Sequence, residues 1–115
     1  MVEFDITSEA QNLLKLMYTL YLSKRDEGKG RIEANYFGDS KEIQSKHLSN
    51  MSVEDVTDLC FELARAGCIT YLKGDNLANE IRLTYEALVY CEQSFQRNIK
   101  NLLEWVSSIK GILPL

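Results

Sequence analysis

The sequence of 115 residues has few of the residues that build metal centres and disulfide frameworks: a single histidine and three cysteines, Cys60, Cys68 and Cys91. No two cysteines form a C-x-x-C pair, and an odd number cannot all pair within one chain, so neither a zinc site nor a disulfide framework is expected. These cysteines are typical of buried thiols in a cytoplasmic protein. We therefore predict no metal, no cofactor and a cytoplasmic location.

Patterns typical of catalysis are also scarce. His47 could contact a phosphate or activate Cys60 as a nucleophile, but a histidine near a helix end is more often a surface residue. Glu54 and Asp58 have an i, i+4 spacing that could hold a cation or a general acid and base, yet no third ligand accompanies them. No glycine-rich phosphate loop follows a predicted strand. We predict that the chain is not an enzyme.

Positive charge is not in excess, because 13 lysines and arginines face 17 aspartates and glutamates, for a formal net charge of -4. The chain as a whole therefore has no attraction for a polyanion such as DNA. Long apolar runs are missing too: Lys15 interrupts the stretch from Leu13 to Leu22, and Glu3 and Asp5 stand where a signal peptide carries basic residues. We expect no membrane span, no export and a single domain over 1–115.

What the sequence does contain is helical periodicity. A capping box from Ser8 to Gln11 predicts a helix that ends at Asp26, before Gly28 and Gly30. Its apolar side chains form two rows, so the helix is expected to pack on two sides. The first row comprises Ala10, Leu13, Leu16, Met17 and Leu20, and the second comprises Leu14, Tyr18 and Leu22. Residues 31–37 are then predicted as a short strand.

Two further helices are predicted before the hairpin. Asp39 or Ser40 can cap a short helix that reaches His47, and Ser52 can cap a third helix that reaches Ala66. The buried face of the third helix is expected to comprise Val56, Leu59, Cys60 and Leu63. The opposite face carries Glu54, Asp58, Phe61 and Arg65. The aromatic ring on that face is therefore expected to be partly exposed among carboxylates.

A hairpin and a long helix complete the pattern. Residues 68–72 and 79–83 alternate apolar side chains as strands do, and Lys73 to Asn76 supply the turn. Thr84 is expected to cap a last helix over 84–110, in which apolar side chains recur every seven residues. At ~1.5 Å rise per residue this helix would be on the order of 40 Å long, more than one small domain needs. We expect it to be a dimerisation element.

The expected homodimer is formed by the first and last helices. The candidate interface residues are Leu14, Tyr18, Leu22, Phe95, Ile99, Leu102, Val106 and Ile109. The alternative is that the apolar stripe of the last helix packs on the second row of the first helix within the same chain. Both arrangements are compatible if the last helix of one protomer crosses the first helix of its partner.

Two strings around the hairpin carry a family resemblance. Leu63, Gly67 and Ile69 form L-x-x-x-G-x-I, and residues 81–87 form I-x-L-T-x-x-A. Over about residues 8–92 the chain resembles the winged helix-turn-helix family, and is similar to small bacterial regulators of the PadR and MarR kind and to short YjcQ-like proteins of bacteria and prophages. The resemblance implies a mainly α fold with a small antiparallel sheet (α+β). It also implies a winged-helix core over 8–83 and a long C-terminal helix over 84–110.

The function that the resemblance implies is DNA-binding transcription regulation at an unknown operator. In such proteins the third helix enters the major groove and the hairpin tip touches the backbone. Carried over by position, the candidate DNA-binding residues are Ser52 and Thr57 at the bases and Lys73 and Asn76 at the backbone. Lys41, Lys46 and Arg82 are further candidates, as nearby cations that could reach phosphates if they converge. The third helix would also turn Glu54, Asp55 and Asp58 towards the bases, and these carboxylates repel the groove.

A second function fits that acidic helix. An exposed aromatic side chain surrounded by charge is typical of an interface anchor. The alternative to DNA binding is therefore a protein-interaction module in which Glu54, Asp58 and Phe61 bind a basic protein partner.

Overall fold

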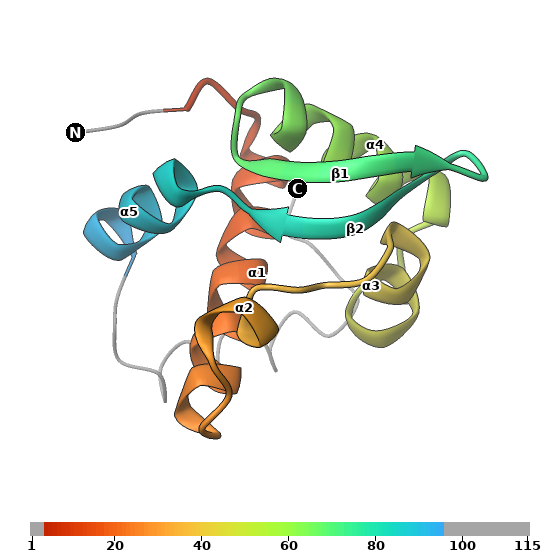
Figure 1. The fold of residues 1–115 in the computed structure, drawn as a ribbon. Coiled ribbons are helices and arrows are strands. Elements are labelled where there is room, and N and C mark those ends of the chain that lie inside the picture. Colours follow the sequence, from red (N-terminus) through yellow and green to blue (C-terminus); the bar gives the residue numbers. More distant parts are fainter. Residues whose placement is uncertain (1–3, 96–115) are drawn as a thin grey trace.

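The structure, a computed structural model, describes residues 4–95 and has an α+β fold of helices and one antiparallel hairpin (Figure 1). The elements in chain order are α1 (Ser8–Asp26), α2 (Arg31–Ala34), α3 (Ser40–His47), α4 (Val53–Arg65), β1 (Ile69–Gly74), β2 (Leu77–Leu83) and α5 (Tyr85–Ser94). Helix α1 contacts α2, α4 and α5, while α4 also contacts α3 and both strands. The coarse prediction of a mainly helical α+β fold is confirmed.

Side-chain caps start the longer helices. Ser52 and Thr84 cap α4 and α5, as predicted, by accepting hydrogen bonds from backbone amides in the first turn. The predicted cap of α1 at Ser8 is wrong by one residue, because Thr7 is extended and its hydroxyl accepts from the Ala10 amide at 3.2 Å. Each such bond satisfies an amide that has no partner within the helix.

The predicted strand over 31–37 is wrong for most of its length, because the single turn of α2 and a short extended stretch replace it. The Phe37 amide donates to the Ile81 carbonyl at 3.0 Å, and the Ile81 amide donates to the Gly38 carbonyl at 2.9 Å. Asn35 continues this pairing through its side chain, which donates to the Leu83 carbonyl at 3.0 Å and accepts from the Leu83 amide at 2.8 Å. A side chain thus occupies the edge of β2 where a longer strand would pair.

The hairpin has a tight turn. Ile69 of β1 lies opposite Leu83 of β2 in an antiparallel ladder. The strands are joined by Asp75 and Asn76, whose φ angles of 54° and 59° are those of a type I′ turn. Aspartate and asparagine tolerate this left-handed conformation better than most residues do.

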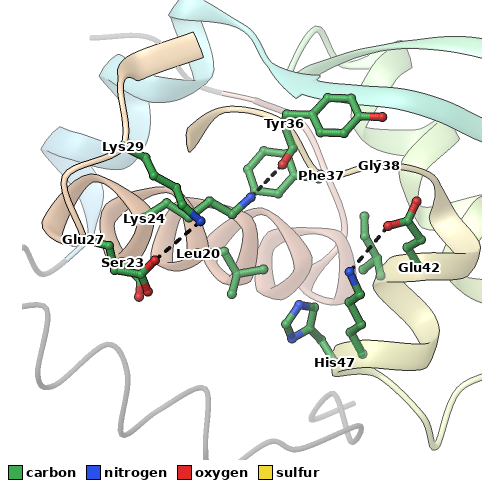
Figure 2. Close-up of a pocket in the computed structure, with 12 residues that line it drawn as sticks. Leu20, Ser23, Lys24, Glu27, Lys29, Tyr36, Phe37, Gly38, Glu42 and His47 are labelled. Carbon is green, nitrogen blue, oxygen red and sulfur yellow. Dashed lines mark hydrogen bonds and ion pairs between the residues drawn. The ribbon is translucent and has the colours of Figure 1, made fainter. Parts of the chain in front are cut away.

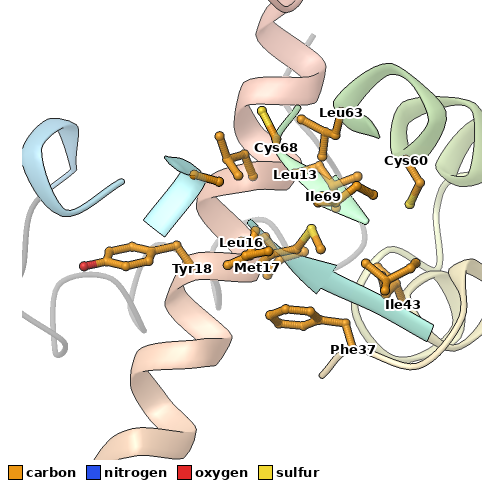
Figure 3. Close-up of a cluster of buried hydrophobic side chains, with 14 of the residues drawn as sticks. Leu13, Leu16, Met17, Tyr18, Phe37, Ile43, Cys60, Leu63, Cys68 and Ile69 are labelled. Atoms are coloured by element: carbon orange, nitrogen blue, oxygen red, sulfur yellow. The ribbon is translucent and has the colours of Figure 1, made fainter. Parts of the chain in front are cut away.

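One buried cluster joins α1, α4 and the hairpin (Figure 3). Its largest fully buried side chains are Leu13, Leu14, Leu16, Met17, Leu48, Val56, Cys60, Leu63, Cys68 and Ile81. Both predicted apolar rows of α1 contribute to it, which confirms that this helix packs on two sides. The predicted buried face of α4 also lies in the cluster.

The predicted dimer interface needs a correction on α1. Leu14 is 0% exposed and Tyr18 is 3% exposed within a single chain. The Tyr18 ring lies 6.4 Å from the Phe95 ring, and α5 also contacts α1. The expectation that Leu14 and Tyr18 face a second chain is therefore wrong, because side chains of the same chain cover them. Leu22 is half-buried.

Helix α5 ends at Ser94, and Phe95 is extended with φ -109° and ψ 154°. The helix predicted over 84–110 is therefore confirmed only as far as Ser94, and residues 96–110 of this prediction lie outside the described residues. The remaining candidate interface residues, Ile99, Leu102, Val106 and Ile109, lie outside the described residues. Within residues 4–95, no helix is both long enough and apolar enough to cross a bilayer.

Candidate functional site

The outward side of α4 carries the acidic surface that the sequence predicts. Glu54, Asp55 and Asp58 are exposed, and we call them the acidic α4 face. Within residues 4–95 the structure shows ion pairs between Lys29 and Glu27 and between Lys46 and Glu42, but none on this face. Its negative charge is therefore not neutralised by a neighbouring lysine or arginine of the described chain.

An aromatic pair borders the acidic α4 face. Phe61 is half-buried, and its ring lies 5.3 Å from the Tyr71 ring of β1 at an interplanar angle of 43°. The prediction that Phe61 is partly exposed is confirmed, although Phe61 also packs against the buried cluster. The exposed acids and this pair together combine negative charge with apolar surface, as interface anchors do.

Two other α4 side chains hold the fold together. The Glu62 carboxylate accepts from the Thr7 amide at 2.6 Å and from the Thr7 hydroxyl at 3.0 Å, which ties α4 to the start of α1. Thr57 is only 4% exposed, and its hydroxyl shares a hydrogen bond of 2.7 Å with Ser40. The assignment of Thr57 as a base-facing residue is therefore wrong, because it points towards α3. Ser40 is buried there, and Asp39 caps α3 instead.

The predicted DNA-binding cations have different surroundings. Lys41 and Lys73 are exposed, and Lys46 forms an exposed ion pair with Glu42 at 3.5 Å. Arg82 is half-buried, donates to the Asn35 carbonyl at 3.2 Å and lies 4.9 Å from the Tyr36 ring centroid. Arg82 thus anchors the stretch after α2. Ser52 and Asn76 are exposed, at the start of α4 and in the hairpin turn.

A second site, which the sequence does not reveal, lies between the C-terminal ends of α1 and α3 (Figure 2). Lys24, Lys29, Lys46 and His47 line a pocket of about 480 Å³, and we call it the basic pocket. Its apolar lining comprises Leu20, Phe37 and Ile43, and two carboxylates, Glu27 and Glu42, lie in it as well. These residues are up to 27 positions apart in the chain, from Leu20 to His47, so no local motif announces the pocket.

The geometry of the basic pocket is best defined around Lys24. Its Nζ donates to the Tyr36 carbonyl at 2.7 Å and lies 5.0 Å from the centroid of the Phe37 ring (Figure 2). Burial lowers the pKa of Lys24, and the positive charges of Lys29 and Lys46 lower it further. Burial also lowers the pKa of His47, with additional effects of Lys46 and Lys24. Cationic groups are therefore crowded in this pocket.

The three cysteine side chains are buried in the core. Cys60, Cys68 and Cys91 are each 0% exposed. Burial raises the pKa of Cys60 and of Cys68 to about 12, and it raises the pKa of Cys91 as well. The thiolate, which is the nucleophilic form, is thus disfavoured at neutral pH. In the part of the chain that the structure describes, no three histidine, cysteine, aspartate or glutamate side chains gather as a metal site would require.

Comparison with known proteins identifies no family. No protein-family model matches the chain. Neither the curated proteins nor the solved structures contain a significant match. The function is therefore inferred from the acidic α4 face and the basic pocket.

Proposed function

We propose that this chain is a winged-helix protein-interaction module whose acidic α4 face binds a basic protein. The observation that carries the proposal is the set of three exposed carboxylates on one helix, without an ion-pair partner within residues 4–95. A partner that brings lysines or arginines to this face gains attraction, and the Phe61–Tyr71 pair offers it apolar surface.

The same carboxylates oppose the use of α4 as a DNA-reading helix. A carboxylate about 4 Å from a phosphate costs about 1 kcal/mol even in bulk water, and more where water is excluded. Three such groups would therefore cost roughly 3 kcal/mol, or about a hundredfold in affinity. Thr57, one of the few neutral candidates for contact with bases on α4, is buried and cannot make such a contact. These facts support a basic protein as the ligand of α4.

The test compares two probes on the full chain at low salt: a labelled peptide rich in arginine and leucine, and a labelled DNA duplex, both followed by fluorescence anisotropy. We expect the peptide to bind more tightly than the duplex. The double variant Glu54→Gln/Asp58→Asn should weaken peptide binding by about three- to tenfold, because exposed ion pairs contribute about 0.2–1 kcal/mol each. Phe61→Ala should weaken it as well.

The matched control is Asp26→Asn/Glu86→Gln, which changes the net charge equally through exposed carboxylates on α1 and α5. It should leave peptide binding within about twofold of the wild type. Equal weakening in the two double variants would show that only net charge matters, and the proposal would then be wrong. Tighter binding of the duplex than of the peptide would contradict it as well.

A second candidate function is DNA-binding transcription regulation. The observation in its favour is the exposed Lys73 and Asn76 at the hairpin, together with exposed Lys41 on α3. If these residues touch phosphates, duplex affinity should fall with salt, and Lys73→Gln should reduce the log–log salt slope by about 1. Arg31→Gln on exposed α2 is the matched control. Failure of the chain to bind any duplex at low salt would exclude this function.

A further inference from the structure

We propose that the basic pocket binds a small organic oxyanion, a phosphate monoester or carboxylate attached to an apolar group. The oxyanion would lie among Lys24, Lys46 and His47, and the apolar group against Phe37 and Ile43. This site is separate from the acidic α4 face, and it is independent of the function proposed for that face.

The first support is the convergence of cationic groups from distant parts of the chain. Lys24 comes from α1, Lys29 from the following loop, and His47 from the last turn of α3 (Figure 2). Lys46 belongs to the same last turn of α3. The pocket holds three ammonium groups, of Lys24, Lys29 and Lys46, and two carboxylates, of Glu27 and Glu42. The pocket therefore keeps a net positive charge even when the imidazole is neutral.

The ion pairs within the pocket are easily exchanged for a ligand. Lys29 lies 3.6 Å from Glu27, and Lys46 lies 3.5 Å from Glu42, and all four side chains are well exposed. Exposed pairs of this kind contribute little to stability, so a bound anion can replace them at small cost. An ammonium has three donors, and the hydrogen bond of Lys24 to the Tyr36 carbonyl uses one of them.

The shape and lining of the pocket suit a ligand with an apolar part. Its volume of about 480 Å³ lies within the range of ligand sites, ~300–1,000 Å³. Phe37 and Ile43 are buried core residues whose side chains also line the pocket, beside Leu20. The lining is therefore mixed, with charged side chains around a smaller apolar part, and it suits a ligand that itself has a charged and an apolar part.

One wall of the pocket depends on a glycine. Gly38 has φ +71°, and a Cβ there would lie 2.5 Å from a carboxylate oxygen of Glu42. A side chain at position 38 would therefore displace Glu42, and with it the ion pair to Lys46. The absence of a side chain at Gly38 thus permits the Glu42 carboxylate to lie close to the backbone at this wall of the pocket.

The crowding of positive charge supports the same conclusion. Lys29 and Lys46 lower the pKa of Lys24, and Lys46 and Lys24 lower the pKa of His47, in each case after a larger effect of burial. Glu27 and Glu33 act in the opposite direction on Lys24. A bound anion would relieve the repulsion that remains.

The test is a titration of the full chain with phenyl phosphate, inorganic phosphate and benzoate, followed by the NMR signals of the backbone amides and of the single imidazole. We expect saturable shifts at Gly38 and His47 with phenyl phosphate, and weaker binding of inorganic phosphate, which lacks the apolar part. Lys24→Gln and Lys46→Gln should each weaken phenyl phosphate binding by about tenfold, as the loss of a charge-assisted hydrogen bond does.

The matched control is Lys41→Gln, an exposed lysine of the same helix α3 that does not line the pocket. It should leave the affinity unchanged. Equal weakening by Lys41→Gln and Lys46→Gln would overturn the proposal, since attraction would then be a property of overall charge. Because Lys46 is exposed, its substitution tests the site even if Lys24→Gln fails to fold.

The remaining outcomes also decide the question. If inorganic phosphate binds as tightly as phenyl phosphate, the proposal that the pocket binds an apolar group is wrong. Benzoate that binds more tightly than phenyl phosphate would identify the oxyanion as a carboxylate. A DNA duplex that shifts the same signals more strongly than any small anion, with the same loss in Lys46→Gln, would overturn the small-molecule ligand in favour of a nucleic-acid backbone.

Discussion

At the scale of single residues, two hydroxyl groups join three elements of the fold. Ser40 of α3 and Thr57 of α4 share a hydrogen bond of 2.7 Å, and the Ser40 hydroxyl also accepts from the Ala78 amide of β2 at 3.3 Å. Both side chains are buried. A polar group that loses its partner in such a place has no water to replace it.

We predict that Thr57→Val destabilises the protein by about 1 kcal/mol, because it removes the hydroxyl while it keeps the volume of the side chain. The free energy of unfolding in urea is the measurement. Thr70→Val, at an exposed position of β1, is the matched control and should change stability by less than about 0.5 kcal/mol. Equal stability of Thr57→Val and the wild type would mean that this bond is not formed in solution.

The second residue-scale prediction concerns His47. In the unfolded chain its pKa is near 6.5, and burial together with the charges of Lys46 and Lys24 lowers its pKa in the folded protein. Between these two values the unfolded state binds more protons, so stability is complete above pH ~6.5 and is lost as the pH falls towards the folded-state pKa. His47→Gln should abolish this part of the pH dependence. The measurement is the free energy of unfolding in urea between about pH 7.5 and about pH 5.5.

The imidazole titration provides the independent check. Because His47 is the only histidine in the chain, its ring protons are easily assigned in an NMR spectrum. A midpoint at or above 6.5 would contradict the prediction.

At the scale of elements, the hairpin turn shows how local chemistry determines structure. Asp75 and Asn76 both have positive φ, which glycine, asparagine and aspartate adopt at least cost. The turn was predictable from its residue types, and so were the caps at Ser52 and Thr84, because each depends on neighbours within a few positions.

We predict that Asn76→Val destabilises the protein by about 1–2 kcal/mol, since a β-branched side chain is strained at φ 59°. Asn76→Gly should be neutral or slightly stabilising, because glycine adopts this conformation without strain. Urea unfolding midpoints measure both effects. Equal destabilisation by the two substitutions would instead assign the effect to the loss of the asparagine amide.

The segment after α1 could not be predicted in the same way. Residue type predicts a strand over residues 31–37, whereas the chain forms α2 and its backbone pairs with β2 only at Phe37 and Gly38. The deciding contact is the side chain of Asn35 on Leu83, 48 positions away. Pairing over such a distance is decided by tertiary packing rather than by local propensity.

At the scale of the whole molecule, the buried core contains residues for which the sequence suggests a reactive or an interface role. Cys60, Cys68 and Cys91 lie in the same buried cluster as Leu14 and Tyr18. The cluster therefore includes both the candidate nucleophile and part of the expected dimer surface. These residues serve the packing of α1, α4 and α5 in one chain.

We predict that all three thiols react slowly with a disulfide reagent such as Ellman's reagent in the native protein and quickly in denaturant. They are fully buried, and burial raises the pKa of each thiol. Ser49→Cys, at an exposed position, supplies a control thiol that should react at once. One rapid equivalent of reaction in the native wild type would show that a cysteine is accessible.

The sequence by itself determined where most helices begin, which residues form the turn, and that α4 has one apolar and one acidic side. These properties depend on spacing and on contacts between near neighbours. Only the tertiary structure decided that Thr57 faces Ser40, that Tyr18 packs on Phe95, and that lysines from α1 and α3 share a pocket with His47. The physical reason is that such contacts join residues far apart in the chain, whose proximity is created by the burial of a common core.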